Sequence, residues 1–369
     1  MTYAPLPTFK QLFFAFFNQP KPAALAYPWQ RETEPYFWLA RSQHSLSLLA
    51  QLRLRFSPKK NITIWIPDYF CNSVLDPLRT FGAQLVFYPV TESLSPDITW
   101  CSQHAANNPP DLLIVVHYFG QPTPIQEAVI FCKMHQAWLI EDAAHVLKPI
   151  SGVGEVGDFI LYSPHKHLAI PDGALLLARN PSVVPLLEKL YAEISYQPPV
   201  FKSMRWLVKR LLQKTQLIPI RPMSVDSPHS IPSQLLYKIS SFSQKLLSVQ
   251  LNALDQFAML RQKNKQILHA QMISQSEIMP WEMSDTPYLA GFICETAEVA
   301  KQHYACFQKQ GYPVQTWPDL APEVLSAPDV YPVANRFYRT RLFVGVHQTL
   351  KIPPNPPFKR GGTDFNRYC

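Results

Sequence analysis

The chain has 369 residues, which allows two domains and a large core, and its hydrophobic fraction of 47% excludes a chain that is mainly disordered. Six cysteines without a CxxC pair argue against a disulfide framework and a structural zinc site, so we expect a reducing, cytoplasmic compartment and no metal. The net charge of +8 would suit a nucleic-acid binder, but no nucleic-acid motif accompanies it, and no apolar stretch reaches the roughly 18 residues of a membrane span.

Strands and helices are predicted to alternate along the first half of the chain. Residues 1–34 are proline-rich and predicted to be irregular, whereas the leucines of Tyr36–Arg55 have helical spacing. The following elements are predicted in order: strand Ile62–Ile66, short helix Asn72–Phe81, strands Leu85–Tyr88 and Leu112–Val116, helix Thr123–His135, and strands Trp138–Ile140 and Phe159–Tyr162. This alternation indicates an α/β domain with a mostly parallel central sheet flanked by helices.

The second half of the chain predicts a smaller α/β domain. Ser203–Gln216 reads as a basic amphipathic helix, Pro219–Pro232 as a break, and Ile231–Met272 as one long helical region. A strand at Tyr288–Ile293, a helix at Ala297–Gln310 and a strand at 311–314 follow. We therefore expect an N-terminal segment and large domain at 1–225, the long helix and a small C-terminal domain at 226–351, and a disordered tail at 352–369.

Polar residues follow two of the predicted strands. Glu141 and Asp142 come after one strand, and Ser163 and Lys166 come after the next. Because open α/β sheets carry their chemistry at the carboxyl ends of strands, Asp142 and Lys166 are predicted to face one cavity. There the acid can pair with the ring nitrogen of a cationic aromatic cofactor, and the lysine can form a Schiff base. The alternatives are a helix N-cap at Asp142 and a surface lysine.

Weaker signals surround this pair. His145 follows Asp142 and is either a hydrogen-bond donor to a phenolic oxygen or a core histidine. Ser42 and Gln43 precede the first strong helix, whose N-terminus would offer backbone N–H groups to a phosphate. Two aromatic residues after the strand Ile62–Ile66 would stack on a cofactor ring or belong to the core, namely Tyr69 and Phe70.

Several stretches together resemble the DegT/DnrJ/EryC1/StrS family of pyridoxal-phosphate aminotransferases of fold type I. Residues 140–145 (IEDAAH) resemble the family's Glu-Asp-Ala-Ala-Gln stretch, and residues 157–168 resemble its Gly-Asp, Phe-Ser and Lys-x-Leu block. Residues 40–46 (ARSQHSL) stand where the family has a Ser-Gly-Thr-x-Ala-Leu phosphate segment. Residues 117–122 (HYFGQP) resemble its His-x-x-Gly strand end.

The resemblance implies roles for the candidate residues. Lys166 would form the Schiff base with pyridoxal 5'-phosphate, Asp142 would pair with the ring nitrogen, and His145 would stand near the phenolic oxygen. Ser163 and the backbone of Ser42 and Gln43 would bind the phosphate, and Tyr69 or Phe70 would stack on the ring. The implied reaction moves an amino group from an amino acid, glutamate or glutamine, to a keto sugar, a nucleotide-linked sugar or a related carbonyl compound. The implied assembly is a homodimer.

Departures from the family pattern keep other functions open. The family's Gly-Thr is Ser42-Gln43 here, and residues 224–230 stand where a Gly-x-Asn-x-Arg segment is expected. The alternatives are another reaction of the same cofactor, such as dehydration, and a catalytically degenerate homologue with a ligand-binding or regulatory role. Arg41, Arg261 and Arg341 are candidates for binding the donor carboxylate. The basic segment 203–216 would contact an anionic surface peripherally or be a solvated helix.

Overall fold

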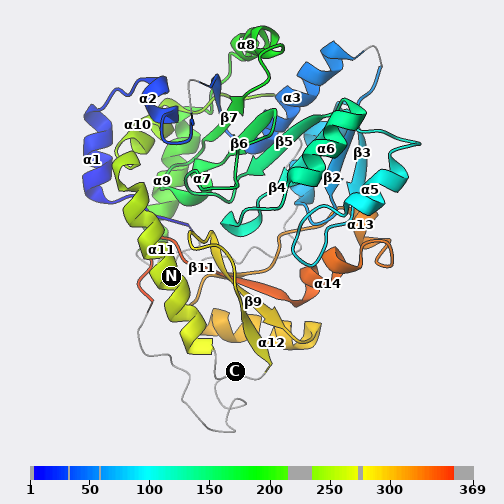
Figure 1. The fold of residues 1–369 in the computed structure, drawn as a ribbon. Coiled ribbons are helices and arrows are strands. Elements are labelled where there is room, and N and C mark those ends of the chain that lie inside the picture. Colours follow the sequence, from blue (N-terminus) through cyan, green and yellow to red (C-terminus); the bar gives the residue numbers. More distant parts are fainter. Residues whose placement is uncertain (1–3, 32–33, 58–59, 215–234, 273–276, 353–369) are drawn as a thin grey trace.

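The computed structural model describes residues 4–31, 34–57, 60–214, 235–272 and 277–352. A seven-stranded sheet and a four-stranded sheet organise them (Figure 1). The large sheet has the order β1-β7-β6-β5-β4-β2-β3. Its strands are β1 (Tyr36–Leu39), β2 (Thr63–Pro67), β3 (Gln84–Tyr88), β4 (Leu112–Val116), β5 (Trp138–Ala143), β6 (Phe159–Tyr162) and β7 (Ala174–Ala178).

The central strands of the large sheet are parallel. Strands β2 to β6 pair in parallel, while β7 runs antiparallel to both of its neighbours, β6 and β1. All residues of β2, β4, β5 and β6 are buried, as expected for strands covered by helices on both faces. The expected α/β class with a mostly parallel sheet is confirmed.

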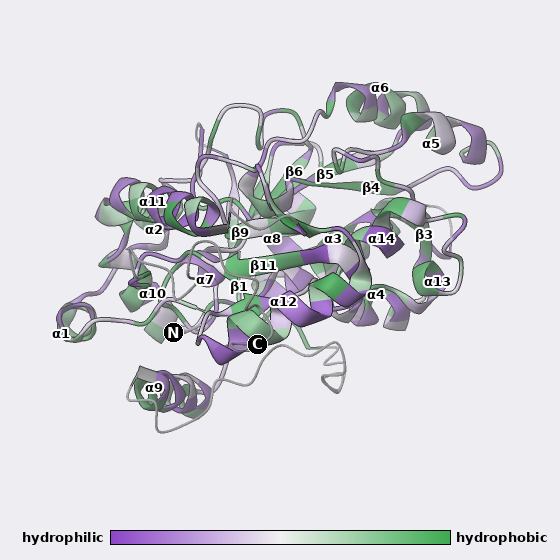
Figure 2. Cartoon of the chain, turned by 90° about the horizontal axis from the view of Figure 1, so that it is seen from below, coloured by the Kyte–Doolittle hydropathy of each residue, from purple (hydrophilic) through white to green (hydrophobic). Residues whose placement is uncertain are grey.

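Helices cover both faces of this sheet. In Figure 2, α5 and α6 lie on one face and α3 lies on the other. The helices up to residue 248 are α1 (Phe9–Phe17), α2 (Pro22–Ala26), α3 (Ser42–Phe56), α4 (Asp76–Thr80), α5 (Ile98–His104), α6 (Gln126–His135), α7 (Pro164–His167), α8 (Val184–Glu193), α9 (Val200–Lys214) and α10 (Ser241–Ser248). Short 3-10 turns are η1 (Asn72–Val74), η2 (Tyr118–Gly120) and η3 (Leu251–Ala253).

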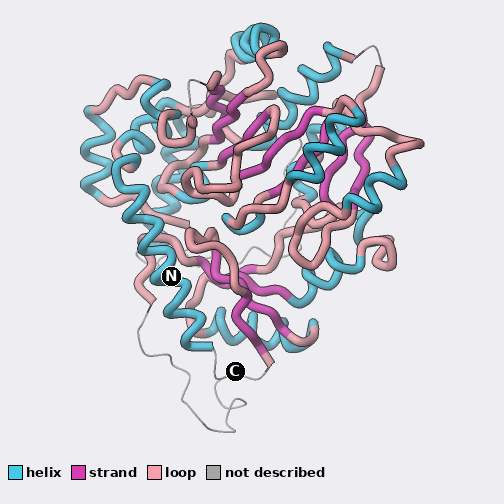
Figure 3. The backbone as a smooth tube through the Cα atoms, in the orientation of Figure 1, coloured by secondary structure: helices cyan, strands magenta, loops and turns pink. Residues whose placement is uncertain are grey.

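The small sheet is antiparallel, with the order β10-β11-β9-β8. It has an apolar cluster of its own that contains Phe292, Phe307 and Val344. Its elements are α11 (Leu254–Met272), β8 (Ile278–Trp281), β9 (Leu289–Cys294), α12 (Ala297–Lys309), β10 (Val314–Gln315), α13 (Pro322–Leu325), α14 (Pro332–Thr340) and β11 (Arg341–Gly345). Figure 3 shows loops between the strands of the two sheets, so loop residues of both sheets can meet there.

The prediction of a helix from Tyr36 is wrong at its start. Residues Tyr36–Leu39 form β1 and pair with residues 174–177 of β7. The three consecutive aromatic side chains of residues 36–38 favour a strand, which can pack on both of its faces. The pairing of this strand with β7 outweighs the helical spacing of the leucines. Arg41 is extended, with φ −145° and ψ 154°, and the helix begins at Ser42.

The prediction of one long helix over Ile231–Met272 is also wrong for its described part. Lys238 forms a β-bridge with Leu39, and the side chain of Ser240 caps a new helix by accepting from the N–H of Ser243. The region is therefore divided into α10, η3 and α11. Similarly, Asn72–Phe81 is divided into η1 and α4, and residues 9–26 form two helices where an irregular segment was predicted.

Some expectations fall outside the described residues. These are the break at Pro219–Pro232, the domain boundary at 225/226 and the tail from residue 353 onward. Among the helices that the structure describes, none has the length and apolar character needed to cross a membrane.

Candidate active site

A cavity of about 240 Å³ lies where the loops after β5 and β6 meet the small sheet. His145 and Lys166 line it from the large domain, Ser42 and Gln43 line it from the start of α3, and Tyr288 and Trp317 line it from the small sheet's loops. The cavity thus joins segments from both ends of the chain. Four of the eight candidate residues line the cavity, namely Ser42, Gln43, His145 and Lys166. A fifth, Asp142, lies close enough to Lys166 to interact with it electrostatically.

Lys166 is held by the short helix α7. Its backbone N–H donates to the carbonyl of Ser163 at 2.9 Å, and the N–H of His165 donates to the carbonyl of Gly173 at 3.3 Å. The side chain is half-buried and lines the cavity. Burial lowers the pKa of the Lys166 amine, and the nearby carboxylate of Asp142 opposes this effect. A lowered pKa increases the neutral, nucleophilic fraction of the amine.

Asp142 lies within β5, between Val116 of β4 and Leu161 of β6 in register. Its carboxylate Oδ1 accepts from the N–H of Ala144 at 2.9 Å, and the side chain is buried. Burial raises the pKa of this carboxyl, and the positive charge of Lys166 acts in the opposite direction. Because β5 continues to Ala143 and a turn follows, the N-cap alternative for Asp142 is wrong.

His145 is a neutral imidazole with a defined tautomer. Its Nδ1 accepts from the N–H of Phe119 at 3.3 Å, which leaves the ring proton on Nε2. The ring is stacked on Tyr288, with centroids 4.6 Å apart and an interplanar angle of 11°. Burial holds the pKa of His145 well below its usual range. The Nε2–H group is therefore a donor beside the cavity rather than a positive charge.

Glu141 faces a different set of partners from its neighbour Asp142, since side chains alternate along a strand. Its carboxylate accepts from the N–H groups of Gly154, Val156 and Gly157 at 2.6, 2.9 and 2.6 Å, and from His117 Nε2 at 2.9 Å. Burial alone would raise the pKa of Glu141, but these hydrogen bonds bring it below its usual value. Glu141 therefore orders the loop 152–157 rather than lining the cavity.

Donors for a ligand stand at the start of α3, which lines the cavity, and at Ser163, which directly precedes α7. Helix α3 begins at Ser42 without a side-chain cap, so no side chain accepts from its first N–H groups. The hydroxyl of Ser163 is fully buried and has no hydrogen-bond partner. A buried polar group without a partner costs about 1–3 kcal/mol, which a bound acceptor would remove. These donors suit an anionic group such as phosphate.

Tyr69 and Phe70 are both buried and do not line the cavity. Tyr69 stacks on Trp317, with centroids 4.4 Å apart and an interplanar angle of 25°. The cavity wall is formed instead by Cys71, Phe119 and Trp317. Sequence reasoning did not assign Phe119, Tyr288 or Trp317 to the site. The Trp-Pro pair at residues 317–318, after a short strand, is a signal that could have pointed there.

The three candidate arginines differ in their surroundings. Arg261 is buried and donates to backbone carbonyls of His167 at 2.9 Å and Tyr288 at 3.2 Å. Arg341 lies over the ring of Phe337, 4.2 Å from its centroid. Of the three, Arg41 lines the cavity.

Comparisons with known proteins show what the chain is similar to in sequence and in fold. A family model described as the DegT/DnrJ/EryC1/StrS aminotransferase family matches residues 72–312. Among solved structures, the chain is similar to the aminotransferase TlmJ from Streptoalloteichus hindustanus, with a TM-score of 0.70 and 17% identity over 95% of this chain and 94% of that chain. It is also similar to PseC from Helicobacter pylori, an aminotransferase involved in the biosynthesis of pseudoaminic acid, with a TM-score of 0.66 and 14% identity over 95% and 94%.

A third similar structure is the E. coli GDP-4-keto-6-deoxy-D-mannose-3-dehydratase with bound hydrated PLP. Its TM-score is 0.67, with 13% identity over 94% of this chain and 95% of that chain. At these identities the likeness shows a shared fold. The comparison with curated proteins gives no match.

Proposed function

Because the chain belongs to the DegT/DnrJ/EryC1/StrS aminotransferase family, we propose that it uses pyridoxal phosphate to move an amino group from glutamate or glutamine to a keto sugar, a nucleotide-linked sugar or a related carbonyl compound. The observation that carries the proposal is the pairing of a half-buried lysine, whose pKa is lowered by burial, with the buried carboxylate of Asp142. The sugar part of the proposal is supported by the similarity to the putative sugar aminotransferase Spr1654 from Streptococcus pneumoniae, with a TM-score of 0.69 and 15% identity over 95% of this chain and 94% of that chain.

The residues of the cavity fit the cofactor. Its phosphate has candidate donors in the Ser163 hydroxyl and in the backbone at Ser42 and Gln43. Its phenolic oxygen would accept from His145 Nε2, and its ring nitrogen would donate to Asp142. When bound, pyridoxal phosphate supplies an electron sink for the carbon that carries the amino group.

Lys166 has two tasks in this proposal. Its neutral Nζ would hold the cofactor, and as a free amine, once a substrate amine has displaced it, Nζ would be the group placed to move a proton between two carbons. The carboxylate of Asp142 would hold a proton on the ring nitrogen by accepting a hydrogen bond from it. His145 donates Nε2–H without adding charge. The aromatic wall of Phe119, Tyr288 and Trp317 limits the access of water. We propose that these three side chains contact the cofactor ring, and Tyr69, which stacks on Trp317, would support them from behind.

An absorbance experiment tests the proposed function. Purified protein with added pyridoxal phosphate should show a band at the edge of the visible range, and Lys166→Ala should remove it. Lys189→Ala, which changes an exposed lysine on α8, is the matched control and should keep the band. Addition of glutamate should then convert the cofactor to its pyridoxamine form. A wild-type protein that stays colourless would refute the enzyme and favour a degenerate homologue, and a bound cofactor that glutamate does not convert would favour another reaction.

We also propose a cytoplasmic homodimer, as the family resemblance implies, with a large domain over 1–225 and a small domain over 226–351. The separate apolar cluster of the small sheet, which contains Phe292, Phe307 and Val344, supports a small domain of its own. The dimer is testable by sedimentation, where a monomer at micromolar concentration would contradict it.

Finally, we propose a peripheral contact between an anionic surface and residues 203–216, of which 203–214 are described. Helix α9 exposes apolar and basic side chains together, namely Val200, Phe201, Met204, Val208, Lys202, Arg205 and Lys209. Apolar side chains can enter the headgroup region while the cations meet anionic lipids. Flotation with anionic vesicles should carry the protein upward, and Arg205→Glu should weaken this. Absence of binding would refute the contact.

A further inference from the structure

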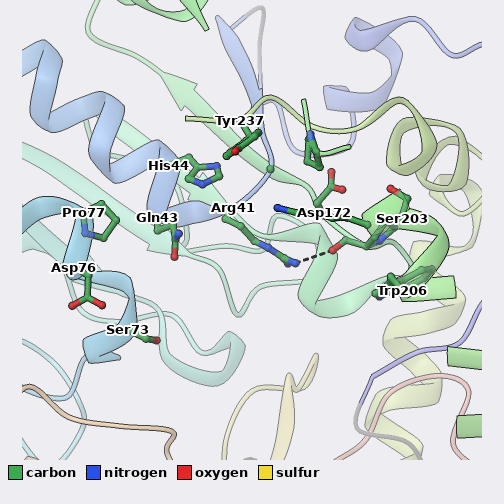
Figure 4. Close-up of a pocket in the computed structure, with 14 residues that line it drawn as sticks. Arg41, Gln43, His44, Ser73, Asp76, Pro77, Asp172, Ser203, Trp206 and Tyr237 are labelled. Carbon is green, nitrogen blue, oxygen red and sulfur yellow. Dashed lines mark hydrogen bonds between the residues drawn. The ribbon is translucent and has the colours of Figure 1, made fainter. Parts of the chain in front are cut away.

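A second cavity, of about 330 Å³, adjoins the first at the start of α3. Arg41 and Gln43 line both cavities, so the two meet at these residues. Figure 4 shows Arg41 extending from the start of α3 toward Ser203 and Trp206 of α9. The guanidinium of Arg41 therefore stands at the boundary between the proposed cofactor site and the space beside α9.

The positive charge of Arg41 has little compensation within the chain. Its Nη2 donates to the carbonyl of Pro171 at 2.9 Å, and in the part of the chain that the structure describes no carboxylate forms an ion pair with it. Asp172 lies near, but its two oxygens accept at 2.8 Å from the N–H and the hydroxyl of Ser240. The Asp172 carboxylate is thus held by the start of α10.

Other cations surround Arg41. Its charge contributes to lowering the pKa of both Lys166 and Arg210, in each case after burial as the larger cause. Lys202 also lines the second cavity. A group of like charges is unfavourable unless an anion joins it, and a guanidinium is a bidentate partner for phosphate.

We propose that Arg41 binds the phosphate of the cofactor, together with the backbone of Ser42 and Gln43. This inference rests on the proposed function, since it assumes that pyridoxal phosphate occupies the cavity with Lys166. Three features support it: Arg41 directly precedes the helix start, it lines the cavity, and most of its N–H groups have no described acceptor. The same guanidinium was a candidate for the donor carboxylate, and the test below separates these two roles.

The experiment compares two ligands that differ only in the phosphate. Apoprotein of the wild type, Arg41→Met and Arg41→Lys is titrated with pyridoxal phosphate and with pyridoxal, and binding is followed by absorbance. Arg41→Met should weaken binding of pyridoxal phosphate about 10–100-fold, the effect of losing charge-assisted hydrogen bonds, and should change binding of pyridoxal less than about twofold. Arg41→Lys should be intermediate, because it keeps the charge and loses the bidentate geometry.

Inorganic phosphate gives an independent readout. In the wild type it should compete with pyridoxal phosphate but not with pyridoxal, and Arg41→Met should weaken this competition. Arg55→Met is the matched control, since it removes an exposed arginine from the other end of α3 and should leave both affinities unchanged. Circular dichroism and thermal unfolding of the apoproteins identify a variant that fails to fold, and Arg41→Gln then replaces Arg41→Met.

Each outcome decides the inference. Equal affinity of wild type and Arg41→Met for pyridoxal phosphate would overturn it. If Arg41→Met kept that affinity and raised the KM for glutamate, the arginine would bind the donor carboxylate instead, which also overturns it. A wild type that binds neither ligand would refute the proposed function itself, and this result differs from the other two.

Discussion

The substitution Glu141→Gln should destabilise the protein strongly, although it changes a single atom. Each carboxylate oxygen of Glu141 accepts two hydrogen bonds. Oε1 accepts from Val156 N–H at 2.9 Å and Gly157 N–H at 2.6 Å, and Oε2 accepts from Gly154 N–H at 2.6 Å and His117 Nε2 at 2.9 Å. The amide group of glutamine must replace one oxygen, so two donors would face an NH₂ group whichever way the amide is oriented.

The expected loss follows from these four bonds. A hydrogen bond to a charged group contributes about 1.5–3 kcal/mol, so the loss of two lowers the free energy of unfolding by about 3–6 kcal/mol. The two remaining bonds also weaken, because the acceptor is no longer charged. Since a domain is stable by only about 5–15 kcal/mol, the variant should be marginally folded. Asp142 follows Glu141 in β5, so cofactor affinity should also fall.

Urea unfolding, followed by tryptophan fluorescence, measures this loss. Glu155→Gln is the control, because Glu155 lies in the same loop but is more than one-third exposed and should lose less than about 1 kcal/mol. The folded pKa of Glu141 lies below its ordinary value, so its stabilisation is present above the ordinary pKa and is lost as pH falls through the folded pKa. The glutamine variant should lack this acid dependence. A loss below about 1 kcal/mol, with an unchanged urea slope, would refute the reasoning.

Two further predictions concern the acids Asp68 and Asp319. Burial raises the pKa of Asp68 to about 7 from 3.8, so its contribution of about 4 kcal/mol should be lost as pH rises between these values. Urea unfolding at about pH 5 and about pH 8.5 covers the upper part of this window, so the wild type should lose about 3 kcal/mol between them and Asp68→Asn should not. An equal free energy of unfolding of the wild type at the two pH values would contradict the prediction. Asp319 accepts from Cys71 Sγ and Ser73 N–H, both at 2.9 Å, so Asp319→Ala should cost about 1–3 kcal/mol and speed alkylation of Cys71. The exposed Asp329→Ala should do neither, and an unchanged alkylation rate would exclude the contact.

Several strands and the segment of the proposed site could be predicted because they depend on local pattern. Apolar runs that end in polar residues predicted β4, β5 and β6 and the segment around Lys166. The local pattern singled out Asp142, but it ended the strand at Ile140 and so gave no physical reason for the two adjacent acids to differ. Once β5 extends to Ala143, alternation separates Glu141 from Asp142 and gives each a different partner set.

Other parts of the site depend on tertiary contacts that no local pattern contains. Tyr288 and Trp317 reach the cavity from loops of the small sheet, far along the chain from Lys166. The leucine spacing of Tyr36–Arg55 correctly predicted a helix from Ser42 onward, but the first four residues form a strand because they pair with β7. Tyr69 follows a strand as expected, but its ring stacks on Trp317 and does not reach the cavity. Sequence spacing therefore located the lysine and the acid, and the fold determined the wall around them.

The charges around Lys166 favour a ligand with two different ends. Burial holds the pKa values of His145, His165 and His167 well below their usual range, so these rings are neutral. The remaining charges are the cations Lys166 and Arg41 and the carboxyl of Asp142, whose pKa burial raises. A simple anion would pair with Arg41 but would offer no cation to Asp142. The carboxyl of Asp142 would then have only Lys166 as a cationic partner, and Lys166 must be neutral to react. A ligand with a phosphate and a protonated ring nitrogen would complement both groups and free the lysine for chemistry.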